Sequence, residues 1–304
     1  MHKKIVMAST LLSFLWFAAM AFAAPPPPLK IFVSVPPQKW LSDKIGGTLV
    51  TTDVLVNKGQ DPHTYEPTPK QLTTLSQAKI YFTLDLEFER QIIPKLEQTV
   101  PTLHIIDTAA SIPKIAMTEH EHDEPEPNDQ VHTNKEHQHQ EGLDPHVWLS
   151  PLNLKIMAAD MARAMIASDP VNKTTYEKNL LEVNKILDQV HQKIVQELAP
   201  YQGASFYVFH PAFGYFAHTY HLQQQAIETG GKSPSPRQLS SLITQAKASK
   251  ARVIFVQPQF DPKSAQAIAN AIHGEVVPLD PLAEDVAANL ETMATKIKAA
   301  FSAQ

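Results

Sequence analysis

Short apolar runs alternate with longer amphipathic stretches along most of this 304-residue chain. The runs are typical of buried strands, and the longer stretches repeat their apolar positions at helical spacing. Strands are predicted at residues 30–35, 50–56, 80–84, 102–106, 205–209, 222–227, 253–256 and 275–277. Helices are predicted at residues 38–45, 69–78, 88–98, 153–167, 213–219, 236–249, 262–272 and 284–300. Repeated alternation of strand and helix predicts an α/β fold with parallel sheets covered by helices.

A longer amphipathic stretch at 174–198 predicts one long helix between two such α/β halves. Its expected apolar face comprises Tyr176, Leu180, Leu181, Val183, Leu187, Val190, Ile194 and Leu198. At about 1.5 Å per residue this helix would exceed about 30 Å, so it would make a rigid linker between two lobes. The chain then divides into a signal peptide, an N-terminal lobe, a linker helix and a C-terminal lobe, at residues 1–23, 24–169, 170–200 and 201–304.

The first residues are typical of a secretory signal. Lys3 and Lys4 precede an apolar stretch from 5 to 22, and Ala21-Phe22-Ala23 has the small-x-small pattern of a cleavage site. The stretch is short for a membrane anchor, which favours cleavage. We therefore expect an exported, periplasmic protein, without a lipid anchor because no cysteine follows the cleavage site.

The composition narrows the chemistry. With 26 Lys and Arg against 31 Asp and Glu the net charge is −5, which argues against a protein that binds nucleic acid through phosphate neutralisation. The absence of cysteine excludes disulfides, thiolate metal sites and cysteine nucleophiles. Histidine is abundant, with 14 residues.

Part of this histidine lies in residues 119–141, which have no apolar period and eight acidic residues against one lysine. Such a composition predicts an irregular, solvated loop. Imidazoles and carboxylates bind metals, so the loop is a candidate for weak zinc binding; the simpler alternative is an insertion kept soluble by its charge. Its candidate ligands are His120, His122, His132, His137 and His139.

Three other histidines are predicted in loops that follow strands. His63 and His146 each end an Asp-Pro-His sequence, and His210 begins His-Pro after a predicted strand. Asp280 offers a carboxylate after another strand. Ligands of open parallel sheets bind beyond the carboxyl ends of the strands, and three imidazoles with one carboxylate suit Zn²⁺. A single histidine beside proline is more commonly a capping or surface residue; it is the recurrence that favours a metal site.

The neighbouring residues support such a site. Proline fixes its own φ and restricts the residue before it, so each imidazole would project from a stiffened turn. Asp61 and Asp144 are expected to accept a hydrogen bond from a ring N–H, as carboxylates do beside metal-bound histidine.

These motifs together resemble the metal-specific periplasmic solute-binding proteins of ABC uptake systems, in particular the zinc-binding ZnuA-like branch. The similarity covers Asp-Pro-His-Thr-Tyr-Glu-Pro at 61–67, the histidine-rich insertion, Asp-Pro-His-Val-Trp at 144–148, the sequence from Phe209 to Phe216, and Leu-Asp-Pro-Leu at 279–282. The resemblance implies that His63, His146 and His210 are the metal ligands, with Asp280 or water in the fourth place. It also implies a monomer that passes Zn²⁺ to a membrane permease.

Two other functions remain open at this stage. A manganese or iron carrier would have the same fold, although members with those metals usually have Glu at the position of His210. A secreted zinc hydrolase would use the fourth metal position for an activated water, with Glu66 or Glu228 as the base. The sequence has no His-Glu-x-x-His motif, which argues against the hydrolase.

Overall fold

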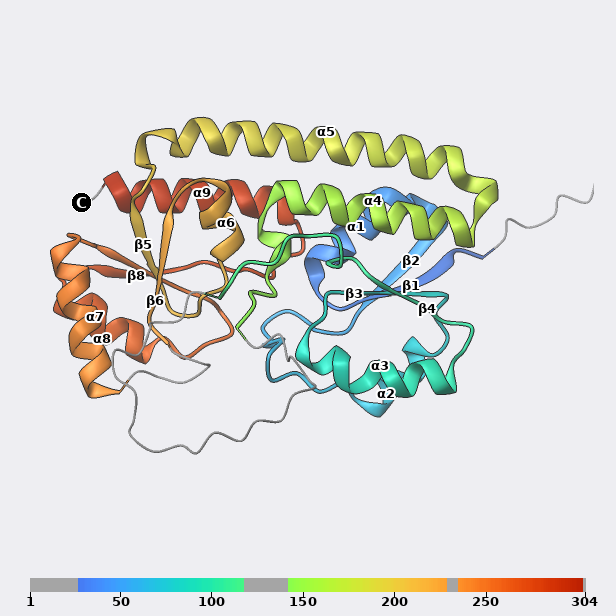
Figure 1. The fold of residues 1–304 in the computed structure, drawn as a ribbon, viewed down its shortest axis with the longest axis horizontal. Helices are drawn as coiled ribbons and strands as arrows, with labels where there is room; N and C mark the ends of the chain where they lie inside the picture. Colours follow the sequence, from blue (N-terminus) through green and yellow to red (C-terminus); the bar gives the residue numbers. More distant parts are fainter. Residues whose placement is uncertain (1–26, 118–141, 229–234, 303–304) are drawn as a thin grey trace, which may run out of the picture.

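The computed structural model describes residues 27–117, 142–228 and 235–302, which form two α/β lobes (Figure 1). The predicted α/β class, with parallel sheets covered by helices, is confirmed. The predicted signal peptide and the histidines of the 119–141 loop lie outside the described residues.

The N-terminal sheet consists of four parallel strands in the order β2-β1-β3-β4. Their bounds are β1 (Leu29–Val33), β2 (Val50–Val54), β3 (Ile80–Thr83) and β4 (His104–Asp107). Helices α1 (Pro36–Gly46), α2 (Pro69–Leu75) and α3 (Glu87–Thr99) connect them, with a 3-10 turn η1 (Gly47–Leu49) before β2. Thr68 caps helix α2 at its N-terminus, where its side chain accepts a hydrogen bond from the Gln71 backbone N–H.

The C-terminal sheet repeats this topology in the order β6-β5-β7-β8, again all parallel. The strands are β5 (Ser205–Val208), β6 (Gln223–Ala226), β7 (Val253–Val256) and β8 (Glu275–Pro278), and the helices are α6 (Gly214–Thr219), α7 (Pro236–Ala248), α8 (Lys263–Ala271) and α9 (Val286–Ser302). The two lobes therefore share a strand order although the sequence shows no clear repeat.

Helix α4 (Pro151–Ser168), the turn η3 (Pro170–Asn172), helix α5 (Lys173–Leu198) and the turn η4 (Ala199–Tyr201) lead from one lobe to the other, and a further turn η2 (Val147–Leu149) precedes α4. Figure 1 shows α5 running along one side of the molecule over both lobes, with α2, α3, α7 and α8 on the far side of the sheets. With 26 residues, helix α5 is about 39 Å long. The predicted linker helix is confirmed.

One position on α5 differs from the prediction. Leu181 is 69% exposed, whereas the other predicted face residues are buried or partly buried. At about 100° per residue, Leu181 points about 140° away from Tyr176, so it belongs to the solvent side of the helix.

A single cluster of buried apolar side chains extends across both lobes. It includes strand residues of both sheets, the inner face of α5, and residues of α4 and α9. A smaller cluster lies between α7, α8 and the C-terminal sheet. Within the described residues, no helix is both long and apolar enough to span a bilayer.

Candidate metal centre

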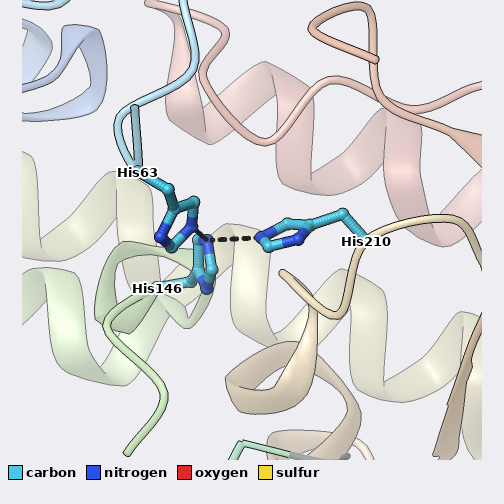
Figure 2. A group of neighbouring side chains, drawn as sticks. All are labelled: His63, His146 and His210. Carbon is cyan, nitrogen blue, oxygen red and sulfur yellow. Dashed lines mark hydrogen bonds between the residues drawn. The ribbon is translucent and has the colours of Figure 1, made fainter. Parts of the chain in front are cut away.

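The loops that follow the strands bring three histidines to one point between the lobes (Figure 2). His63 lies in the loop between β2 and α2, and His146 lies immediately before η2. His210 follows β5 of the other lobe. Each offers a ring nitrogen, and the three nitrogens lie within 4.8 Å of one another. The predicted convergence of these side chains is therefore present.

The spacing of the nitrogens suits a tetrahedral ion. His146 Nε2 lies 3.3 Å from His63 Nε2 and 3.4 Å from His210 Nε2 (Figure 2). Two nitrogens each about 2.0–2.1 Å from a tetrahedral zinc ion lie about 3.3–3.4 Å apart. Two of the three nitrogen pairs therefore already have the separation that zinc requires.

The space between the rings has the size of an ion or a single water. A cavity of about 10 Å³ is lined by the three histidines, Trp148 and Phe260, among others, so both lobes form its wall. A space of about 10–15 Å³ accommodates one water molecule. The His210 ring stacks on Phe260 at 5.0 Å between ring centroids, and His146 meets Trp148 edge-on at 5.3 Å. These aromatic walls limit the centre to a small occupant.

Buried carboxylates hold two of the rings from behind. Asp144 Oδ1 lies 2.8 Å from His146 Nδ1, and Glu228 Oε1 lies 2.5 Å from His210 Nδ1. A carboxylate accepts, so in each pair Nδ1 carries the hydrogen and Nε2 presents a lone pair to the centre. The predicted role of Asp144 is confirmed.

The same prediction is wrong for Asp61. Its Oδ1 accepts a hydrogen bond from the backbone N–H of His63 at 3.0 Å, and Thr64 Oγ1 donates to its Oδ2 at 3.3 Å, so the carboxylate stabilises the turn instead of the ring. His63 is only partly buried, whereas His146 is buried and its ring nitrogen needs a partner inside the protein.

The environment keeps the imidazoles of His63 and His146 neutral. Burial, together with the neighbouring His146 and His210, lowers the pKa of His63 to about 3. Burial also lowers the pKa of His146 well below its usual value. The pKa of Asp144 is raised by burial to about 7, and a cation between the rings would favour its charged form. Neutral imidazole is the form that binds metal, so the centre is prepared to receive a cation.

Asp280 lies outside this group of three. Its Oδ1 accepts hydrogen bonds from Gln259 Nε2 at 3.2 Å and from the backbone N–H of Leu282 at 2.9 Å. The carboxylate is thus held by donors of its own lobe, and its sequence neighbours Pro281 and Leu282 line the cavity.

Sequence reasoning did not identify three residues that support His210: Glu228, Gln257 and Phe260. Gln257 receives the His210 backbone N–H on Oε1 at 3.1 Å and donates through Nε2 to the His210 carbonyl at 2.6 Å. Gln257 directly follows β7, and Glu228 lies two residues after the end of β6; these two strands flank β5. Residues that follow β6 and β7 lie at the same sheet edge as His210, which would have identified them. Using that signal requires knowing that β6 and β7 are the neighbours of β5.

Comparison with known proteins agrees with this geometry. The chain is 28% identical over 267 residues to the high-affinity zinc uptake system protein ZnuA of Yersinia pestis, covering 84% of each chain. It is 27% identical to the zinc-binding lipoprotein AdcA of Streptococcus pneumoniae over 84% of this chain and 51% of that protein.

Solved structures show the same fold. A crystal structure of ZnuA superposes with a TM-score of 0.80 at 38% identity, covering 90% of this chain and 99% of that one. A zinc-bound ZnuA deletion mutant gives the same TM-score at 39% identity, covering 91% and 99%. The model of the family described as "Zinc-uptake complex component A periplasmic" matches residues 31–300. This chain therefore belongs to the ZnuA family of periplasmic zinc-uptake components.

Proposed function

We propose that this protein captures Zn²⁺ between its lobes with His63, His146 and His210 and delivers it to the permease of an ABC transporter. The spacing of the three ring nitrogens supports the proposal most directly, since two of the three pairs match a tetrahedral zinc ion. The fourth position is open to water or to Asp280. The protein acts as a periplasmic monomer after removal of residues 1–23, without a lipid anchor.

The donor set favours zinc over manganese or iron. Three neutral imidazoles suit Zn²⁺, whereas Mn²⁺ prefers oxygen ligands. A hydrolytic role lacks a base in the right place: Glu228 lies behind the His210 ring, bound to its Nδ1, and Glu66 is exposed to solvent. Zinc binding accounts for the three histidines and the carboxylates behind them, and it needs no catalytic base.

Alanine substitution of the ligands tests the site. His63→Ala, His146→Ala and His210→Ala should each weaken zinc binding more than about 100-fold, beyond the 10–100-fold typical for residues that only support a ligand. Asp280→Ala should cost less than about 10-fold, because water can replace one carboxylate. Calorimetry with competing chelators on protein without residues 1–23 measures both effects.

His104→Ala is the matched control, because His104 is an exposed histidine on β4. Its zinc affinity should equal that of the wild type. Unchanged affinity in the three ligand variants would reject the site, and an equal loss in Asp280→Ala would make Asp280 a full ligand.

A further inference from the structure

Helix α6 of the C-terminal lobe lies against the segment that carries Asp144. Thr219 donates a hydrogen bond through Oγ1 to Ser150 Oγ at 3.0 Å. The Tyr215 hydroxyl accepts one from the backbone N–H of Ile115 at 3.4 Å, and the Ile115 carbonyl accepts the Asp144 N–H at 2.9 Å. One lobe thus contacts the residue that orients a ligand of the other lobe.

The closest approach occurs at Gly214, the first residue of α6. A Cβ at this position would lie 2.3 Å from Asp144 Oδ2 and 3.4 Å from Ile115 Cδ1. Contacts under about 3.0 Å do not occur for real Cβ atoms, so any side chain here would displace the carboxylate. Only glycine leaves room for Asp144 in its observed place.

Asp144 cannot move without cost. Its Oδ1 accepts hydrogen bonds from both the backbone N–H and the ring Nδ1 of His146, each at 2.8 Å. Its Oδ2 is buried and has no hydrogen-bond partner among the described residues. The position of this oxygen atom therefore depends on the packing of the atoms around it. A carboxylate pushed away by a methyl group at Gly214 would give up one or both bonds to His146.

We propose that Gly214 is a positioning residue for zinc binding: its missing side chain lets α6 pack against Asp144 and keep that carboxylate on His146 Nδ1. The inference rests on the proposed zinc site. Gly214 acts through Asp144 and His146, and it lies four residues after His210 in the same loop region. Gly214 therefore links the orientation of His146 in one lobe to the loop that carries His210 in the other.

Zinc titration of a double-mutant cycle tests the proposal. Gly214→Ala should weaken zinc binding about 10–100-fold, the range seen when the partner of a metal-bound histidine is lost. Asp144→Ala should lose affinity in the same range. The double variant should bind no more weakly than Asp144→Ala alone, because a truncated Asp144 leaves space for the methyl group.

Nitrogen NMR of metal-free protein supplies a readout that a purely structural role would not change. Wild-type His146 should show hydrogen on Nδ1, and Gly214→Ala should increase the form with hydrogen on Nε2. If Gly214→Ala fails to fold, the double variant should still fold as Asp144→Ala does.

Gly46→Ala is the control. A Cβ there would lie 2.2 Å from Val50 Cγ2, an equally close side-chain contact at the opposite end of the N-terminal sheet. It should lower the melting temperature and leave zinc affinity unchanged. The inference would be overturned if Gly214→Ala bound zinc with wild-type affinity, or if the double variant lost the product of the two single losses in affinity. It would also be overturned if the double variant alone failed to fold. Absence of zinc binding in the wild type would instead reject the zinc site itself.

Discussion

At the scale of single residues, the three histidines differ in what holds them. His146 and His210 each have a buried carboxylate on Nδ1, whereas Asp61 holds the turn containing His63 through the His63 backbone N–H and the Thr64 hydroxyl and leaves the ring unsupported. The orientation of two rings is therefore set before an ion arrives, and the partly exposed His63 is the ring with freedom to adjust. Changes to the two carboxylates should affect zinc binding more than changes to Asp61.

Glu228→Gln isolates the contribution of charge behind His210. The amide can still accept the Nδ1 hydrogen, but it does not stabilise the positive charge that builds on a metal-bound imidazole. We expect zinc affinity to fall about 10-fold by calorimetry, with a melting temperature of the metal-free protein close to that of the wild type. Asp61→Asn is the matched carboxylate-to-amide control and should change affinity much less; the reverse order would contradict the assigned roles.

The pH dependence of the tight site follows from the shifted pKa values. Three ordinary histidines would each take up a proton as the pH falls below about 6.5, and zinc would have to displace three protons. Here the pKa of His63 is about 3 and that of His146 is also lowered, so these rings stay unprotonated between pH 7 and 5.

We therefore expect the tight site to release about two protons or fewer per zinc ion at pH 5.5. Calorimetry in buffers of different ionisation enthalpy measures this number. A release of three protons would mean that the metal-free rings are solvated, contrary to their observed burial.

At the scale of elements, local signals predicted the helices and strands closely and failed where a partner is distant in sequence. The linker helix predicted at 174–198 is observed at 173–198, because its apolar period and flanking polar residues are local features. The predicted inward position of Leu181 is wrong, because its angle on the helix places its side chain on the solvent side. Glu228 was not assigned to His210 because the pairing depends on β6 lying beside β5, which no local pattern reveals.

The connection between β4 and η2 offers a test of the histidine-rich segment. The backbone N–H of Met117 donates to the Gly142 carbonyl at 2.7 Å, and Ala116 pairs antiparallel with Leu143. The ends of the segment are thus already joined by hydrogen bonds. Replacing residues 119–141 with an Asn-Gly turn should therefore preserve the fold around His146.

We expect this deletion to keep one tight zinc site and to remove additional weaker binding, which in the full chain should fade between pH 7 and 5 as ordinary imidazoles protonate. Calorimetry with excess zinc counts both classes of site. A full-length variant with alanine at all five loop histidines is the control and should give the same result. Loss of the tight site in both variants would show that the loop supplies primary ligands.

At the scale of the whole molecule, the lobes are joined by more than the linker. Helix α5 packs against α1 and α4 of one lobe and α9 of the other, over a continuous apolar core. Trp148 donates a buried hydrogen bond through Nε1 to the Pro281 carbonyl at 2.8 Å, and Lys39 pairs with Glu284 across the lobes. Separating the lobes would break these contacts together, so the centre sits in a stiff frame.

Zinc should therefore stabilise the protein without a large change of shape. A ligand that binds only the folded state adds about 4 kcal/mol at a thousandfold excess over its dissociation constant, which should raise the melting temperature by several degrees. Hinge closure of the kind found in two-lobed proteins with flexible strand connections would require bending α5 and opening its apolar contacts. The radius of gyration of the wild type from small-angle scattering should thus stay the same with and without zinc. The control variant His63→Ala should show no rise in melting temperature on adding zinc and no change in radius of gyration. A clear decrease in the radius of gyration on adding zinc to the wild type would mean that the lobes move as hinged bodies despite the helix that spans them.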